Sequence, residues 1–216
     1  MCSSSSCWHD GSDSRDRACE IGLPRSGKWR LFRLWALSPG NGATRWVGHV
    51  NGKIYGTPAV AGGRVFAPSV AYSLWAFSTS GRPLWHVSTG SYVYSSPAAY
   101  GGRVFFGSYN GAFYGVSAAS GRIDWRVGTG GPISGAAVVV DGVAYAGSFA
   151  HRIVGVDTRT GRVLVRFGHG HYVPVSGNGK FLLFHGYSRL YAVEPKRAVT
   201  RLPAAHTKRH LRHPRK

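Results

Sequence analysis

A unit of about 40 residues recurs along this chain, and this internal repeat restricts the fold more than any other feature. Glycine recurs at Gly81, Gly121 and Gly161, which are 40 residues apart. A tryptophan follows the first two of these glycines by four residues, at Trp85 and Trp125. A repeat of this length indicates stacked copies of one unit, which is either a pair of helices or a small sheet.

Local periodicity favours the small sheet over the pair of helices. Each copy contains a short run, rich in β-branched and aromatic residues, that has the length of a strand: 64–68, 103–107 and 143–147. Each run follows a pair of residues suited to a tight hairpin with positive φ: Gly62-Gly63, Gly101-Gly102 and Asp141-Gly142. In the most regular copy we expect four antiparallel strands, at about 96–100, 103–108, 112–117 and 122–127.

A four-stranded sheet of this size has two faces to bury, so the copies must stack on one another. Radial stacking of such sheets is a β-propeller. The sequence therefore predicts an all-β chain, a β-propeller of four-stranded antiparallel blades with about four blades present. Three complete copies span 54–168, and partial copies precede and follow them.

The partial copies predict an incomplete ring. Residues 32–37 and the strand near Trp46 correspond to the third and fourth strands of a blade, whereas 172–193 supply a last blade without a fourth strand. An open ring exposes two edge blades, which favours self-association. The alternative is a four-bladed ring in which the strand near Trp46 completes the last blade.

The stretch from Gly102 to Trp125 resembles the PQQ-like (pyrroloquinoline-quinone-type) propeller repeat, and the resemblance extends over about 30–194. The tryptophan-docking pattern of that family, a glycine with a tryptophan four residues later, occurs three times: Gly42 and Trp46, Gly81 and Trp85, and Gly121 and Trp125. A fourth copy keeps Gly161 but has Val165 in place of the tryptophan. The resemblance implies that each indole covers the glycine-rich backbone of the adjacent blade. A platform on which a ligand stacks is the other interpretation. Members generally have seven or eight blades, so the resemblance implies a partial propeller.

Composition divides the chain into three segments. We expect a disordered leader over 1–28 that holds all three cysteines, a propeller over 29–195 and a disordered basic tail over 196–216. Lys and Arg number 27 against 8 Asp and Glu, so contact of the tail with a polyanion, either a nucleic acid or an anionic membrane, is one hypothesis. No apolar run reaches the length of about 18 residues that a membrane-spanning helix needs.

The cysteines and histidines offer two candidate metal sites. Cys2, Cys7 and Cys19 lack a fourth ligand at zinc-finger spacing, so we expect no metal there. His169 and His171 lie on one face of an extended segment, between two blades, where a metal or an anion could bind. The other interpretation is a pair of solvated loop histidines, and a third ligand would have to come from His151 or His185.

Quinoprotein alcohol dehydrogenases share this repeat, and the resemblance raises the question of a cofactor. Those enzymes hold a calcium-bound quinone through carboxylate and amide ligands beside a catalytic aspartate. Residues 29–194 contain four carboxylates, and each has an ordinary place in a turn or a strand: Asp124, Asp141, Asp157 and Glu194. Calcium needs several oxygen ligands together. We therefore predict no cofactor, no metal and no catalytic residue.

The function predicted from the sequence is that of a noncatalytic propeller, which serves as a scaffold or sensor-type module for an unknown protein partner. The alternatives are a remnant of a quinone-dependent oxidoreductase and a polyanion-binding module. By family analogy we expect the bacterial cell envelope or the extracellular side, although the sequence shows no signal peptide.

Overall fold

The computed structural model describes residues 17–22, 31–172, 176–177, 182–186 and 188–193, and every regular element in them is a β-strand. These strands form five antiparallel sheets. The fold class predicted from the repeat, an all-β propeller of four-stranded blades, is confirmed. None of the described segments is a helix long and apolar enough to cross a membrane.

The three central sheets have four strands each, in sequence order. The second sheet comprises β4 (Ala59–Ala61), β5 (Arg64–Ser69), β6 (Ser73–Ser78) and β7 (Pro83–Ser88). The third comprises β8 (Ala98–Tyr100), β9 (Arg103–Gly107), β10 (Ala112–Ser117) and β11 (Ile123–Gly128). The fourth comprises β12 (Val138–Val140), β13 (Val143–Ser148), β14 (Arg152–Asp157) and β15 (Val163–Phe167).

The two end sheets have three described strands each. The first comprises β1 (Arg17–Gly22), β2 (Leu31–Leu37) and β3 (Thr44–Asn51). The fifth comprises β16 (Ser176–Gly177), β17 (Leu182–His185) and β18 (Leu190–Val193). The sequence analysis assigned Arg17–Gly22 to a disordered leader, but the structure pairs this segment with β2 as an additional strand. The rest of the leader and the tail from 194 onward lie outside the described residues.

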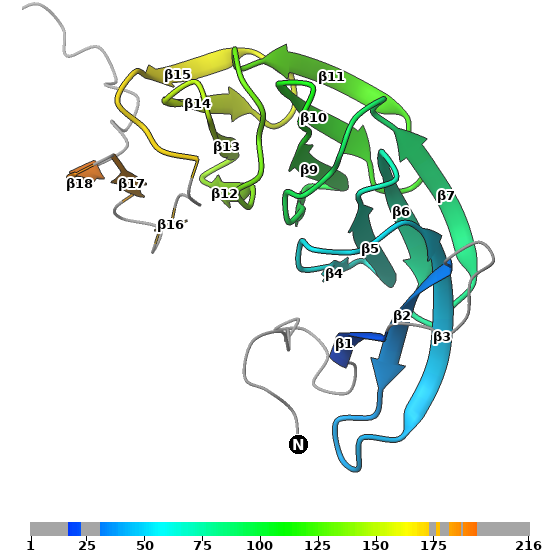
Figure 1. The fold of residues 1–216 in the computed structure, drawn as a ribbon. Coiled ribbons are helices and arrows are strands. Elements are labelled where there is room, and N and C mark those ends of the chain that lie inside the picture. Colours follow the sequence, from blue (N-terminus) through cyan, green and yellow to red (C-terminus); the bar gives the residue numbers. More distant parts are fainter. Residues whose placement is uncertain (1–16, 23–30, 173–175, 178–181, 187, 194–216) are drawn as a thin grey trace, which may run out of the picture.

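The five sheets follow one another around an open arc, with the short strands β4 and β12 on its concave side and the long strands β3, β7, β11 and β15 on its convex side (Figure 1). Among the described strands, no pairing joins the first sheet to the fifth. The alternative of a closed four-bladed ring is therefore not the arrangement found, because β3 pairs with β2 and β18 pairs with β17.

The core lies between neighbouring sheets rather than within any one of them. Strands alternate their side chains between two faces, so each central sheet contributes to two apolar layers. Phe66, Leu74, Val104 and Phe106 are fully buried in the layer between the second and third sheets. Equivalent layers fill the other three junctions. This stacking fixes the relative positions of the loops at both ends of the sheets.

The loops lie at the two opposite ends of the sheets, because consecutive strands are antiparallel. The first end, here called the tryptophan face, carries the turns between the first and second strands and between the third and fourth strands of each central sheet. The second end, the tyrosine face, carries the turns between the second and third strands together with the connections from one sheet to the next. Those connections are 52–58, 89–97, 129–137 and 168–172.

Candidate functional site

Three tryptophans join neighbouring sheets on the tryptophan face. A Cβ added to Gly81 would lie 2.7 Å from Cγ of Trp46, and Nε1 of Trp46 donates a hydrogen bond of 2.7 Å to the carbonyl of Thr79. Trp85 likewise donates to the carbonyl of Ala118, at 3.2 Å. Each indole thus combines an apolar contact with a satisfied N–H on the turn of the following sheet.

Trp125 repeats this geometry, whereas Gly42 and Val165, at the two ends of the series, do not. A Cβ at Gly161 would lie 2.6 Å from Cβ of Trp125, whose Nε1 donates to the carbonyl of Thr158 at 3.2 Å. Gly42 has a φ of +71° with nothing within 4 Å of its Cβ direction, so the structure gives it a turn role rather than an indole contact. Val165 packs at the junction of the fourth and fifth sheets. These contacts lie between sheets, as packing requires.

The tyrosine face carries a second aromatic set, which the sequence analysis did not identify. Seven rings in the turns and connections of this face contact one another in a continuous series, here called the aromatic ladder: Tyr55, Tyr72, Tyr92, Tyr94, Tyr109, Phe149 and Tyr172. The ring centroids of Tyr94 and Tyr109 are 4.8 Å apart, and those of Phe149 and Tyr172 are 4.3 Å apart. The ladder therefore crosses from the second sheet to the far side of the fourth.

Much of the ladder is open to solvent. Tyr55 is 59% exposed, and Tyr72, Tyr92, Phe149 and Tyr172 are 39–44% exposed. Scattered apolar side chains are normal on protein surfaces, but a contiguous set of this kind marks an interaction site. Tyrosine is also a preferred residue at binding surfaces, because it offers a large rigid ring and a polar tip.

Buried hydroxyl groups fix the backbone beneath the ladder. Ser108, which is fully buried, donates hydrogen bonds toward Oγ1 of Thr89 (3.1 Å) and toward the carbonyl of Tyr92 (3.2 Å). The amide of Tyr109 donates to the same carbonyl at 2.9 Å. Ser69 and Ser148 occupy the matching position in the neighbouring sheets and are equally buried. The rings are thus carried by loops that one sheet holds against the next.

Two side chains on this face are displayed from strained backbone. Tyr72 has a φ of +67° and His151 a φ of +56°, at the turn position where the third sheet has Gly111 with a φ of +78°. A non-glycine residue in this region costs about 1–2 kcal/mol, so a glycine would be easier to accommodate at both positions. Both strained residues expose their side chains on the tyrosine face.

Contacts within the ladder raise the pKa of two of its phenols. Partial burial and the neighbouring phenols of Tyr109, Tyr55 and Tyr92 raise the pKa of Tyr94, and this outweighs the opposing effect of Lys53. A hydrogen bond with Tyr92 raises the pKa of Tyr72. Both shifts favour the neutral phenol of these two residues.

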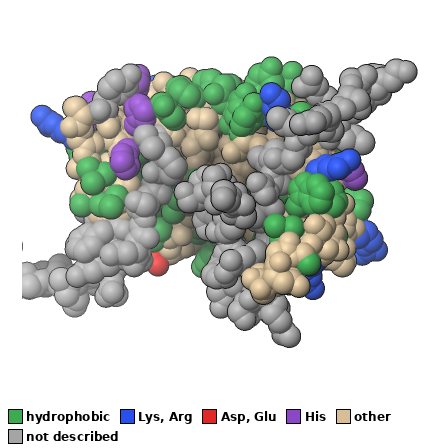
Figure 2. Space-filling model, turned by 60° about the horizontal axis from the view of Figure 1, so that its bottom comes forward, with side chains coloured by type: hydrophobic (Ala, Val, Ile, Leu, Met, Phe, Trp, Pro, Cys, Tyr) green, Lys and Arg blue, Asp and Glu red, His purple; other side chains and the backbone are tan. Residues whose placement is uncertain are grey.

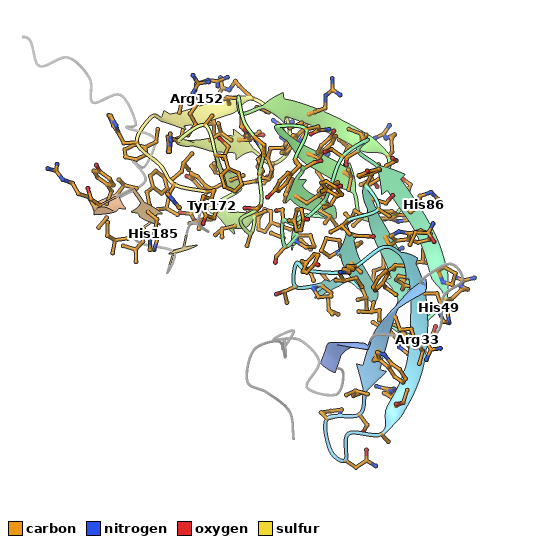
Figure 3. The ribbon with its side chains drawn as sticks, in the orientation of Figure 1. Arg33, His49, His86, Arg152, Tyr172 and His185 are labelled. Atoms are coloured by element: carbon orange, nitrogen blue, oxygen red, sulfur yellow. The ribbon has the colours of Figure 1, made fainter. Side chains whose placement is uncertain are left out.

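A cationic pocket adjoins the end of the ladder. This pocket, of about 520 Å³, is lined by residues of the turns and connections around the fourth and fifth sheets: His151, Gly168, His169, Gly170, Ser188, Arg189 and Tyr191. A second hollow of about 390 Å³ shares Gly168 and is lined by Arg152 and Arg166 among others. None of the described lining residues is acidic. Tyr172 lies on the inner side of the arc and Arg152 on its outer side (Figure 3).

The structure separates the two histidines singled out by their spacing. His169 lines the cationic pocket together with His151. His171 instead packs against Tyr172, with ring centroids 4.1 Å apart, and its backbone N–H donates to the carbonyl of His185 at 2.6 Å. Within the described residues, no group of three or more His, Cys, Asp or Glu side chains is placed to hold a metal ion.

Asp124, Asp141 and Asp157 lie toward the tryptophan face. Asp124 forms ion pairs of 2.9 Å with both Arg103 and Arg122 at the start of β11. Asp141 lies in the turn between β12 and β13, and Asp157 begins the turn between β14 and β15. On the face in Figure 2, hydrophobic patches are bordered by Lys, Arg and His side chains, and acidic side chains are scarce. The tyrosine face combines aromatic rings with positive charge.

Comparisons with known proteins agree with this architecture. A PQQ-like family model described as outer membrane protein assembly factor BamB matches residues 32–197. The crystal structure of BamB from Moraxella catarrhalis has a TM-score of 0.65 at 21% identity, over 81% of this chain and 57% of that one. The computationally designed protein Ika8 has a TM-score of 0.66 at 14% identity, over 82% of this chain and 58% of that one. No curated protein sequence matches.

An enzyme is also among the similar structures. The quinohemoprotein alcohol dehydrogenase ADHIIG from Pseudomonas putida HK5 has a TM-score of 0.50 at 23% identity, over 60% of this chain and 23% of that one. At these identities the likenesses show a shared fold and no more. The chain spans a little over half the length of BamB and of Ika8, at 57% and 58%.

Proposed function

Because this chain belongs to the PQQ-like repeat family whose model is described as outer membrane protein assembly factor BamB, we propose that it is a noncatalytic propeller that holds a partner protein on its tyrosine face. The observation that carries the proposal is the aromatic ladder, in which five of the seven rings are 39–59% exposed. Clustered tyrosines on a fixed backbone supply large contact area at a small cost in side-chain entropy.

The placement of the acidic groups supports a noncatalytic role. Asp124 is engaged by two arginines, and Asp157 accepts hydrogen bonds from Thr160 in its own turn. Both lie at the opposite end of the sheets from the aromatic ladder. A general acid or base has to reach the substrate directly or through one water, and Asp124, Asp141 and Asp157 lie at the other end of the sheets from the exposed rings.

The family name also bears on compartment and boundaries. We propose that residues 29–195, together with the additional strand β1, form the propeller unit, which acts in the bacterial cell envelope as the family description implies. The tail 196–216, to which the polyanion hypothesis was attached, lies outside the described residues. We assign the partner contact to the tyrosine face, where the described side chains offer both apolar area and charge.

Site-specific photo-crosslinking tests the proposal. The photoreactive residue benzoylphenylalanine would replace Tyr92 on the tyrosine face, and, as a matched control, Tyr100 at the opposite end, which is 51% exposed. We expect a discrete protein adduct from position 92 in native cells and none from position 100. Equal labelling at both positions, or none at either, would contradict the proposal. Dye reduction after loading with calcium and pyrroloquinoline quinone would contradict the noncatalytic role.

A further inference from the structure

We propose that the partner presents an extended, proline-bearing segment to the aromatic ladder, with carboxylates beside it that enter the cationic pocket. This inference rests on the proposed function, because it names the chemistry of the segment that the tyrosine face holds. It draws on three observations, namely the length and tilt of the ring series, the position of the positive charge and the rigidity of the supporting loops.

The ladder has the dimensions of a short extended peptide. A direct path along it joins five rings through successive centroid distances of 5.4, 4.8, 6.0 and 4.3 Å: Tyr55, Tyr94, Tyr109, Phe149 and Tyr172. A path of about 20 Å at most corresponds to about six residues of extended chain. The surface therefore matches a linear segment better than a folded domain, which buries a broader patch.

Three of the four successive ring pairs on this path are tilted rather than parallel, whereas the last pair, Phe149 and Tyr172, is stacked at 20°. The interplanar angles are 32° for Tyr55 and Tyr94, 52° for Tyr94 and Tyr109, and 68° for Tyr109 and Phe149. Proline rings fit between aromatic side chains of this kind, and a polyproline II segment is already extended before it binds. Phenol hydroxyls at the rim can donate to the carbonyl groups that such a segment leaves unpaired.

Lys53 acts on Tyr94 toward the first end of the ladder, whereas a larger cluster of positive charge lies at the other end. Arg189 and two histidines line the pocket beside the fourth sheet, and Arg152 and Arg166 line the adjoining hollow. The connection 168–172 joins the two features, because its first three residues line the pocket and Tyr172 ends the ladder. Since no described lining residue is acidic, the pocket complements carboxylates on the partner.

The same charge distribution argues against a nucleic acid. A single strand needs cationic side chains that follow its phosphates, with aromatic rings between them. The middle of this ladder is a run of tyrosine rings in mutual contact, formed by Tyr72, Tyr92, Tyr94 and Tyr109. An uncharged stretch followed by a negative end is instead a pattern that a protein segment can supply.

A fluorescence-polarisation titration of the full chain tests the inference with a defined probe. The probe is a fluorescein-labelled peptide in which a hexaproline run precedes an Asp-Glu-Asp-Glu tail. Two control peptides replace the prolines by glycines or the tail by Lys-Arg-Lys-Arg. We expect the probe to bind with a Kd in the micromolar range, about tenfold or more tighter than either control.

The strained positions supply variants that remove side chains without loss of the fold. Tyr72→Gly removes a ladder ring and His151→Gly removes a pocket imidazole, and both relieve a positive φ. We expect each to weaken the probe about tenfold while the thermal midpoint stays near that of the wild type. Arg189→Glu should also weaken the acidic probe, whereas Tyr100→Ser, on the opposite face, should leave the Kd unchanged.

The outcomes separate this inference from the proposed function. If the probe fails to bind while the crosslink at position 92 persists, the scaffold role stands and the proline-acidic chemistry is wrong. If the glycine control binds as well as the probe, the ladder is not the recognition surface. If an oligothymidylate displaces the probe and binds more tightly than the probe does, the ligand of this face is a nucleic acid and not a peptide. Loss of both probe binding and the crosslink would overturn both proposals.

Discussion

The indole of Trp85 occupies the space that a side chain on Gly121 would need. A Cβ at Gly121 would lie 2.6 Å from Cε3 of this ring, and the backbone of Gly121 has a φ of +73°. The fourth strand of one sheet is thereby joined to the turn of the next. Because residues 31–172 contain no cysteine, no disulfide links these sheets, and such junctions and the apolar layers hold the arc together.

Trp85→Ala should destabilise the fold by about 2–4 kcal/mol, slightly less than a fully buried tryptophan because Trp85 is half-buried. The substitution removes the contact with Gly121, the ring contact with Phe66 and the hydrogen bond to the carbonyl of Ala118. Urea unfolding followed by circular dichroism measures the change. Trp85→Phe keeps part of the ring contact and should cost less. Equal losses in the two variants would contradict the role given to the indole.

Gly121→Ala and Gly102→Ala separate backbone strain from steric overlap. Both glycines have nearly the same φ, +73° and +74°, but a Cβ at Gly102 meets nothing within 4 Å. We expect Gly102→Ala to cost about 1–2 kcal/mol through strain alone. Gly121→Ala should cost at least about 1 kcal/mol more, because Trp85 must also move. Thermal unfolding of the two variants gives the difference in stability. Equal midpoints would show that the indole of Trp85 moves aside without a cost in stability.

Ser108→Ala should lower stability by about 1–3 kcal/mol, because it leaves buried partners on the tyrosine face without the hydroxyl. The Oγ of Ser108 lies within hydrogen-bond distance of Thr89 and of the carbonyl groups of Ser91 and Tyr92. Amide hydrogen exchange at Tyr109, whose N–H donates to Tyr92, should become faster. Ser120→Ala, at an exposed turn on the other face, is the control. Unchanged exchange at Tyr109 would contradict the support assigned to Ser108.

The sequence could predict the sheets because their signals are local. Both residues of the Gly101-Gly102 and Asp141-Gly142 pairs have positive φ, as their composition indicates, and the third sheet has its four strands close to the expected positions. The strand β1 escaped prediction because Arg17–Gly22 matches no copy of the repeat, and its place follows from pairing with β2.

The aromatic ladder could not be predicted in the same way. Tyr72 lies in a turn within one sheet, whereas Tyr92 belongs to the connection that leaves that sheet, so the two positions are not equivalent in the repeat. The rings of Tyr72 and Tyr92 come into contact only when this turn and this connection fold side by side on the tyrosine face. A usable signal was present in the sequence, since tyrosines are frequent in the loops of one end only. The histidine spacing was a weaker guide, because backbone pairing at Gly170 sends His169 and His171 to different neighbours.

Asp157 should make stability depend on pH in the acid range. Hydrogen bonds from the backbone and the hydroxyl of Thr160, together with the amide of Arg159, hold the pKa of this carboxyl below its ordinary value. A carboxyl whose pKa is lower in the folded state binds fewer protons there than in the unfolded chain. Its stabilising effect is therefore complete above the ordinary pKa of about 3.9 and is lost as the pH falls through the lower folded value.

Asp157→Asn tests this dependence, because the amide oxygen can still accept hydrogen bonds in the turn but cannot titrate. We expect the urea midpoint of the wild type to fall between about pH 5 and pH 2 more steeply than that of the variant. Asp157→Ala, which removes the acceptor, should be less stable than both at neutral pH. Because Asp157 lies at the surface, solvent screening keeps the effect small, so the midpoints have to be compared at constant ionic strength. Parallel curves for the wild type and Asp157→Asn would show that this carboxyl makes no contribution of its own to acid unfolding.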